Sequence, residues 1–488
     1  MAWYLTYTIA YFAVMFAIGF YYFFKVKSSD EYLIANWNMG FWSITGTIIS
    51  TCAGAAVFIG WVGMGYSVGI SGFVKFALPA TIFSMILIYF FSKPLRRQRL
   101  YTLADLFAER FGARVGLIPS TFSAFVYSVP TAALQIVGMG TLFTMVFGIP
   151  HEGAILLSFA LILGFTILGG LVATIVTDAL QSVIVIVGIV LLFFAAIRFA
   201  GGPSAIIANS DAGHLSPFGP DGVTEVLVFA LTVGPFYLVW QSIWQRIFAS
   251  RTEGIAIRAG LTGFAIFTVI ALLPYLIGLS AVQFVPQGMR PDLIFSYLTV
   301  ELLPPALGGI VVVGLLSALM TGADSFILQG SSNLAEDLYR RLFKPQATEA
   351  EKMRAARLSV VIISVLSLLV AFLMTDIISA YQWALRISAT TLVIPFLAVM
   401  FWRRATSKGC ASSMLSAIVV TVIWPLVGTG IDPVIPGMLT CLIVLVVVST
   451  MTRHSPQECP RAVYWEDLPT AEKRAKTVPA AEEAAAVV

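Results

Sequence analysis

Charged residues are scarce in this chain: Asp, Glu, Lys and Arg make up 11% of its 488 residues, whereas 59% are hydrophobic. In a soluble domain about a quarter of the residues are charged. The composition therefore excludes an ordinary soluble domain and indicates a polytopic membrane protein in contact with the lipid bilayer. The net charge of +4 reflects basic residues biased toward one set of loops, so we expect no nucleic acid as a partner.

Cysteine and histidine are also rare. The four cysteines, at positions 52, 410, 441 and 459, show no CxxC spacing, which argues against a disulfide scaffold and against a metal site. The three histidines fall in expected loops or in the tail, and none lies where a catalytic base inside the membrane would be needed. The HExxH and nucleophile-elbow motifs are missing as well, so we do not expect an enzyme.

Long apolar runs dominate what is present. With about 20 apolar residues per span, we expect an all-α integral membrane protein with about 13 transmembrane helices. These helices form one transmembrane domain, 1–451. Residues 452–488 are charged and alanine-rich, and we expect a disordered tail there.

The basic residues predict the orientation. In a thirteen-span arrangement they fall on one side of the membrane, which by the positive-inside rule is the cytoplasm. We therefore expect a multi-pass protein of the plasma membrane with its N-terminus outside and its C-terminus in the cytoplasm. The cations that define this side are Lys25, Lys27, Lys93, Arg96, Arg97, Arg99, Arg246, Arg251, Arg340, Arg341, Arg403, Arg404 and Lys408.

The stretch 308–341 is apolar at its start but carries Ser317, Thr321, Asp324 and Ser325 in its middle. Much of this polar set shares one broad helical face. Hydroxyls alone are explained by hydrogen bonds inside a helix bundle. A carboxylate at this depth favours a functional site, because a charge in the membrane is costly unless it lines a cavity or binds an ion.

Two spans are interrupted by glycine or proline. The span at about 39–66 contains the run CAGAA, and the span at about 224–245 contains Gly234-Pro235. Glycine and proline lower the cost of unwinding a helix. The two spans lie five apart, which is typical of a secondary transporter built from an inverted repeat. The alternative is that the glycines permit close packing and the proline makes a simple kink.

Five segments then carry a family likeness: SSDEYLIANWNMGFW, YTLADLFAERFG, GGLVATIVTDALQ, ALMTGADSFILQGSSNLAEDLYRR and FWRRATSKGCA. In this order they resemble the sodium/solute symporter family, whose members carry proline, pantothenate, sugars or sialic acid. The resemblance implies a leucine-transporter-type 5+5 inverted repeat, with repeats at about 39–198 and 224–402 and extra helices at both ends.

The resemblance also implies a sodium site between the broken span and the stretch 308–341. Its backbone carbonyl ligands would come from Ser50, Ala53 and Ala318, and its hydroxyl ligand from Thr321. The family usually has a second hydroxyl at the next position, where this chain has Gly322. Na⁺ is a hard ion that prefers oxygen ligands, and unwound backbone offers carbonyls without a buried charge.

Further cation ligands are implied nearby. Asp178 matches a carboxylate that the family uses for ion passage or for a second sodium site. Asp324 and Ser325 lie where some members place additional hydroxyl ligands. Together with Asp178 they would form a second cation site or a proton-titrating pair.

The solute-binding residues are the least determined by the sequence. Gln382 matches a glutamine that binds substrate in a sugar-carrying relative, but Val57 and Phe76 replace other sugar-contacting polar residues. We therefore expect an amino acid or a carboxylate rather than a sugar. Five further candidates are Phe76, in the place of one of those polar residues, Phe236 and Tyr237, as an aromatic lid or as core packing, and Lys75 and Arg386, as snorkelling cations or as partners of a substrate carboxylate.

These observations predict a secondary active transporter, in which sodium drives symport of a small organic solute into the cell by alternating access. Na⁺ and the solute are then its partners. Two alternatives stay open, a proton-coupled symporter of the same fold and a non-transporting membrane sensor. The tail of roughly 37 residues is short for the output domain of a sensor.

Overall fold

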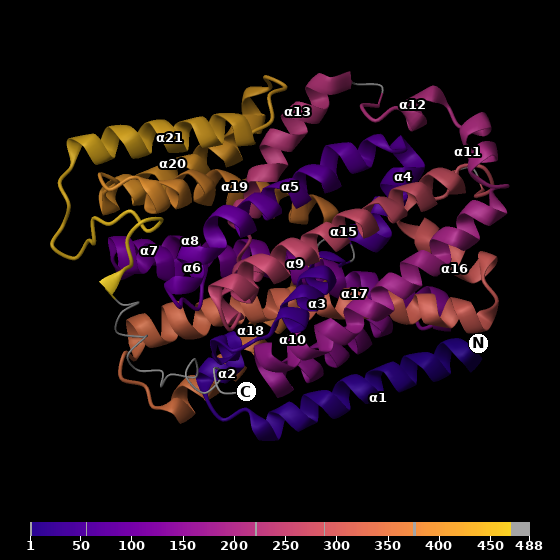
Figure 1. Ribbon diagram of the computed structural model, residues 1–488, viewed down its shortest axis with the longest axis horizontal. Helices are drawn as coiled ribbons and strands as arrows, with labels where there is room; N and C mark the ends of the chain where they lie inside the picture. The colour runs from indigo at the N-terminus through magenta and orange to yellow at the C-terminus, as the bar shows by residue number, and fades with distance from the viewer. Residues whose placement is uncertain (1, 55, 220–221, 287, 374–376, 470–488) are drawn as a thin grey trace.

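The computed structural model describes residues 2–54, 56–219, 222–286, 288–373 and 377–469. Most of its helices run side by side along the long axis of the molecule (Figure 1). Among the described residues, eleven helices are long and apolar enough to cross a membrane, and the bent pair Phe41–Cys52 and Val57–Val68 brings the number to twelve if it is one span. This confirms the expectation of an all-helical chain with many membrane spans.

The first helix, α1 (Ala2–Lys25), covers one edge of the bundle. We use its direction to name the two ends of the bundle. End A is the end at which α1 begins, on the right in Figure 1, and end B is the end at which it finishes, on the left. The elements that follow in the first part of the chain are α2 (Ser29–Ile34), η1 (Ala35–Trp37), α3 (Phe41–Cys52), η2 (Ala56–Trp61), α4 (Val62–Val68), η3 (Phe73–Ala77), α5 (Leu78–Ile86), η4 (Leu87–Phe91), α6 (Ser92–Arg97), α7 (Leu103–Phe111), α8 (Ala113–Thr121), η5 (Phe122–Ser128), α9 (Val129–Phe147) and α10 (His151–Phe199).

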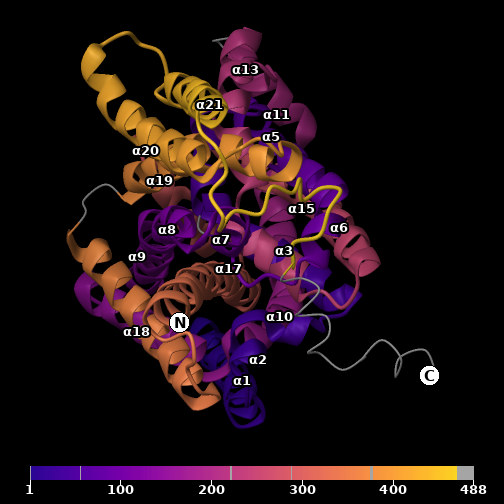
Figure 2. The same cartoon turned by 90° about the vertical axis from the view of Figure 1, so that its left-hand side faces the viewer.

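The second part of the chain returns through the bundle and ends in a helical hairpin, α20 and α21, that lies apart from α1 (Figure 2). Its elements are α11 (Pro203–Asn209), α12 (Ala212–Leu215), α13 (Gly222–Val233), η6 (Gly234–Leu238), α14 (Gln241–Ala249), α15 (Glu253–Ala281), η7 (Pro291–Leu293), α16 (Ile294–Leu302), α17 (Pro305–Ser332), η8 (Asn333–Phe343), α18 (Glu349–Leu373), α19 (Ile377–Phe401), α20 (Ser407–Ile423), η9 (Trp424–Val427) and α21 (Val434–Met451).

Short polar caps explain where several helices begin at end B. The Thr102 hydroxyl accepts a hydrogen bond from the Asp105 amide at 3.0 Å, at the start of α7. Thr252 and Thr406 do the same at the starts of α15 and α20, each at 3.2 Å. Each cap satisfies one amide that has no partner within its helix, so the chain leaves each loop at a defined residue.

The longest helix, α10, reverses direction within its length. Its 49 residues would span roughly 73 Å if straight, more than twice the hydrocarbon core of a bilayer. At Gly170 the backbone has φ 57° and ψ −155°, and a β-carbon there would lie 2.5 Å from the Tyr32 carbonyl oxygen. Only glycine fits this conformation and this contact. Ile155, in the first turns of α10, packs against Gly140 near the end of α9. Phe199, the last residue of α10, has its ring 4.9 Å from that of Phe284. Both ends of α10 lie at end A.

α17 lies in the middle of the bundle, with the other long helices around it (Figure 2). All its residues from 311 to 332 are buried, including the serines, the threonine and the aspartate. The polar stretch seen in the sequence is thus enclosed by protein on every side. It is not a lipid-facing helix.

Both expected helix interruptions are present. α3 ends at Cys52, and the chain resumes as a helix that is tilted by 55° relative to α3. The helix α13 ends at Val233, the Gly234-Pro235 pair lies in the short 3-10 helix η6, and Trp240 is extended before α14 begins. These breaks leave backbone groups without helical partners in the interior of the bundle.

The tail differs from expectation over its first part. Residues 452–469 are packed against end B, whereas 470–488 lie outside the described residues. The Cys459 amide donates to the Arg110 carbonyl at 2.9 Å, and the amides of Val463 and Tyr464 donate to the last turns of α19 at 3.2 and 3.0 Å. A hydrogen bond from Arg403 lowers the pKa of Glu466. Buried apolar side chains such as Leu468 outweigh the charged composition here.

We expect that a side chain at Gly278 would destabilise the close contact between α4 and α15. A β-carbon at Gly278 would lie 2.5 Å from the Tyr66 amide nitrogen and 2.8 Å from the Gly65 carbonyl carbon. Gly278→Ala should therefore destabilise the fold by about 1–3 kcal/mol, since backbone atoms cannot move aside as side chains do. The measurement is the thermal midpoint of the purified protein. Gly60→Ala is the control, because nothing lies within 4 Å of a β-carbon there; equal midpoints for the two variants would contradict the prediction.

Candidate functional site

A group of oxygen atoms lies where the end of α3 meets the middle of α17. The Thr321 hydroxyl is 3.1 Å from the Ser50 carbonyl oxygen and 3.1 Å from the Ala318 carbonyl oxygen. Ser50, Ala53, Ala318 and Thr321 are all fully buried. The Ala53 amide donates to the carbonyls of Ile49 and Ser50, which places Ala53 on the last turn of α3. We name the carbonyls of Ser50 and Ala318 and the hydroxyl of Thr321 the oxygen cluster; Ala53 adjoins it through its amide.

Asp178 on α10 is hydrogen-bonded to the same part of α3. Its carboxylate oxygen Oδ2 accepts from the Thr47 hydroxyl at 2.5 Å, and its backbone carbonyl accepts from the Ser50 hydroxyl at 2.6 Å. Ser50 thus uses its hydroxyl toward α10 and its carbonyl toward Thr321 on α17. This arrangement links the oxygen cluster directly to the buried carboxylate.

Arg246 is the residue that the sequence interpretation misplaced. It was assigned to the cytoplasmic loops, but its side chain on α14 is fully buried, with its guanidinium 3.5 Å from Asp178 Oδ2. It also donates to the Thr47 hydroxyl at 3.2 Å, to the Ser242 carbonyl at 3.0 Å and to the Ser325 hydroxyl. A buried charge requires such partners, and their number explains why an arginine is tolerated here.

The other two predicted cation ligands lie on the same face of α17. The Ser325 hydroxyl lies 3.3 Å from that of Thr51, and it also accepts from Arg246. Asp324 is fully buried, and within the described structure neither of its carboxylate oxygens has a hydrogen-bond partner. Asp178 and Ser325 therefore share one guanidinium, whereas the Asp324 carboxylate lies outside these hydrogen bonds.

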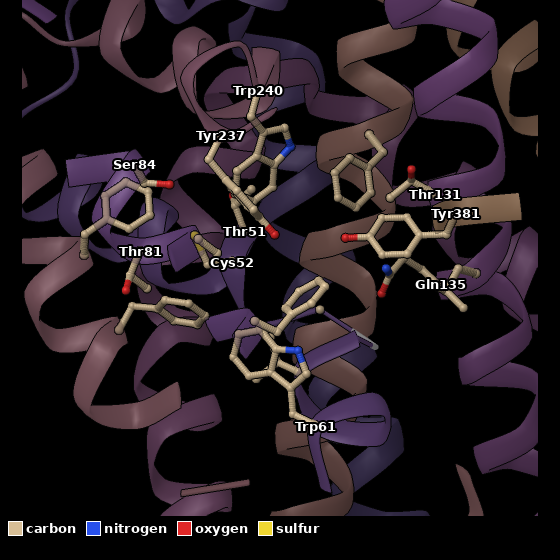
Figure 3. Close-up of a pocket in the computed structure, with 18 of the residues that line it drawn as sticks. Thr51, Cys52, Trp61, Thr81, Ser84, Thr131, Gln135, Tyr237, Trp240 and Tyr381 are labelled. Atoms are coloured by element: carbon tan, nitrogen blue, oxygen red, sulfur yellow. The ribbon is translucent and has the colours of Figure 1, made fainter. Parts of the chain in front are cut away.

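A cavity of about 50 Å³ adjoins the break in α3 (Figure 3). This volume admits a few waters or a small solute. Among the described residues that line it, none is charged. Its polar lining comes from Thr51, Cys52, Thr81, Ser84, Thr131 and Gln135, and its aromatic lining from Trp61, Phe76, Tyr127, Tyr237, Trp240, Phe264, Phe267, Phe326 and Tyr381.

Aromatic rings from the break before α14 form part of the cavity wall. Tyr237 lines the cavity and lies 5.5 Å from Trp240 between ring centroids, and the Phe236 ring is 4.9 Å from that of Tyr127. Phe236 faces a second, smaller cavity of about 10 Å³, together with Gln241. The two adjacent aromatics after the Gly-Pro break thus line different cavities.

The remaining predicted solute-binding residues lie in different places. Phe76 lines the cavity, and Lys75 beside it on η3 is partly buried. Gln382 is exposed, whereas Tyr381 lines the cavity. Arg386 lies 3.5 Å from Asp432 in an ion pair and stacks over Trp383. Within the described structure the cavity therefore brings together Phe76 and Tyr237 but leaves Gln382 and Arg386 outside its lining.

One family model matches most of this chain, and the curated relatives are transporters. The profile of the Sodium:solute symporter family matches residues 32–417. The chain is 28% identical to the osmoregulated proline transporter of Bacillus subtilis (strain 168) over 473 residues, 91% of this chain and 94% of the relative. It is 26% identical to the sodium/pantothenate symporter of Escherichia coli (strain K12) over 472 residues, 92% of this chain and 96% of the relative.

Two solved structures share the fold. A Na⁺-coupled sialic acid symporter in a substrate-bound outward-open state gives a TM-score of 0.82 at 18% identity, covering 93% of this chain and 99% of that one. A nucleobase-cation-symport-1 family transporter in a closed conformation gives a TM-score of 0.60 at 15% identity, covering 92% and 95%. At these identities the likeness is one of fold.

Proposed function

Because the chain belongs to the sodium:solute symporter family, we propose that it takes up a small organic solute together with Na⁺ by alternating access. The observation that carries this proposal is the oxygen cluster at a helix break, with a cavity beside it. Ion and solute binding in adjacent spaces allows each to favour the same conformation, which coupling requires.

In this proposal Na⁺ binds in the oxygen cluster. The Thr321 hydroxyl and the carbonyls of Ser50, Ala53 and Ala318 would be its ligands. Thr321 already lies 3.1 Å from two of those carbonyls. Neutral oxygens suit a hard monovalent ion, since they attract it without the need to bury a carboxylate.

The topology that we propose has thirteen spans in a 5+5 inverted repeat. Support comes from Gly170, where α10 reverses, so that α10 supplies two spans. The break in the α3/α4 span and the break between α13 and α14 are then five spans apart. We place end B in the cytoplasm, where α1 ends at Lys25 and α6 ends at Arg96 and Arg97.

For the solute we propose an amino acid or a small carboxylate, as for the relatives named for proline and pantothenate. Aromatic walls suit an apolar ring or chain. The described lining has no charged side chain, but α14 begins directly after Trp240, which lines the cavity. The amides at that helix start would favour a carboxylate group.

Proton coupling is the second candidate, and one observation favours it. Asp324 is buried without a hydrogen-bond partner among the described residues, as a residue that binds and releases a proton could be. Asp178 fits this role less well, because Arg246 lies beside it.

Uptake into proteoliposomes distinguishes the two candidates. With equal pH on both sides, a sodium gradient should drive accumulation of radiolabelled L-proline or pantothenate, and replacing Na⁺ by choline should remove it. Uptake of either compound that is driven by a pH gradient in sodium-free buffer, and lost in Asp324→Asn, would instead establish proton coupling.

A further inference from the structure

One buried side chain, Gln135 on α9, lines the cavity and lies close to Gly54 and Gly322. It is 2% exposed and lines the cavity together with Thr51 and Cys52 from the last turn of α3 (Figure 3). The sequence interpretation did not select it, because a single glutamine in an apolar span carries no motif.

Two glycines create the space that this carboxamide occupies. A β-carbon at Gly54 would lie 3.1 Å from Gln135 Oε1, and one at Gly322 would lie 2.9 Å from both Cδ and Oε1. Gly54 directly follows Ala53, and Gly322 directly follows Thr321. The carboxamide is therefore held against the residues that follow Ala53 and Thr321, one just after the end of α3 and one on α17.

The contact with Gly322 bears on the cation site because Gly322 is the residue next to Thr321. A serine or threonine at 322 would place a hydroxyl beside that of Thr321, but its β-carbon would overlap with Gln135. A side chain at 322 would therefore displace the Gln135 carboxamide from its present position. A glutamine carbonyl oxygen is a neutral, hard ligand of the same kind as a hydroxyl or a backbone carbonyl.

We propose that Gln135 supplies, through its side-chain oxygen, the ligand of the cation site that Gly322 cannot provide. This inference rests on the proposed sodium coupling. It makes Gln135 a binding residue of the ion on the cavity side, where the same carboxamide faces the solute.

The test uses Na⁺ itself as the probe, with the purified protein in detergent. Thermal midpoints are measured over a series of NaCl concentrations at constant ionic strength with choline chloride, since a ligand of the native state raises the midpoint. For Gln135→Met, which keeps the length of the side chain but removes its oxygen, the half-effective sodium concentration should rise about fivefold. Gln98→Met is the control, a buried glutamine at end B that bonds to the tail. It should lower the midpoint equally in both salts.

A reciprocal exchange gives a second, independent readout. Gly322→Ser alone should weaken sodium stabilisation, because the new side chain displaces Gln135. Gly322→Ser combined with Gln135→Ala should bind Na⁺ better than the sum of the two single effects predicts, since the serine hydroxyl then has room. Additive effects, or a wild-type sodium response in Gln135→Met, would overturn the inference. If the wild-type protein itself shows no sodium-specific stabilisation, the proposed sodium coupling fails, and that result is distinct from a failure of Gln135 alone.

Discussion

Replacing Arg246 by methionine should abolish sodium-driven uptake and destabilise the protein by about 3–5 kcal/mol. Arg246 and Asp178 are both fully buried and 3.5 Å apart, so the variant leaves a carboxylate in the core without its cation. The variant also removes the donor to Thr47 and Ser325, two hydroxyls that connect α14 to α3 and α17. The thermal midpoint in detergent and uptake in proteoliposomes are the two measurements.

A second substitution distinguishes an uncompensated charge from lost packing as the cause of the destabilisation. Asp178→Asn in the Arg246→Met background should reverse at least half of the decrease in the thermal midpoint. A buried pair that is neutral on both sides leaves no uncompensated charge. Arg251→Met is the control, since that side chain is exposed and bonds to Asn38. A single variant Arg246→Met with a wild-type midpoint would show that the buried pair is not needed for folding.

Thr321→Ala should raise the sodium concentration for half-maximal uptake about five- to tenfold, while the protein still folds. The hydroxyl of Thr321 contacts the carbonyls of Ser50 and Ala318, and the neighbouring Gly322 offers no second hydroxyl. Thr321→Ser keeps the oxygen and should stay within about twofold of the wild-type value.

The matched control for Thr321 is Ser331→Ala on the same helix. Ser331 is fully buried and donates to a carbonyl three residues earlier, as Thr321 does, but it lies outside the oxygen cluster. Its sodium curve should be that of the wild type. If Thr321→Ala also keeps the wild-type sodium curve and inserts normally, Na⁺ binds elsewhere.

The fold could be predicted well because membrane helices are determined by local composition. Apolar length predicts the long helical spans, since every backbone group in lipid must be hydrogen-bonded within its helix. Glycine and proline predict the two interruptions, because they lower the cost of unwinding a helix. The count of thirteen spans and the 5+5 repeat remain predictions. The contact of Thr321 with Ser50 and Ala318 agrees with the expected position of the site. The ligand roles themselves remain predictions.

Sequence reasoning missed Arg246 and Gln135 for different reasons. Gln135 is a single glutamine in an apolar span and forms no motif. Arg246 follows an apolar span, just where a cytoplasmic cation is expected, but the break before α14 shifts this helix so that Arg246 is buried and reaches Asp178. A signal was available: residues 247–249 after it are apolar again, which is unusual for a loop. For Gln382 and Tyr381 a difference of one residue changes the helix face by about 100°, and sequence similarity alone does not resolve it.

We expect the packed tail to change the speed of the transport cycle and to leave its driving force unchanged. Residues 459–464 hydrogen-bond both to Arg110 at the end of α7 and to Val399 and Met400 at the end of α19. Any step that separates these two helices must first break those backbone contacts, so the tail adds to the height of that barrier. The final accumulation ratio depends only on the gradients and the stoichiometry. A chain that ends before residue 459 should therefore reach the same steady-state level as the full chain but approach it at a different rate.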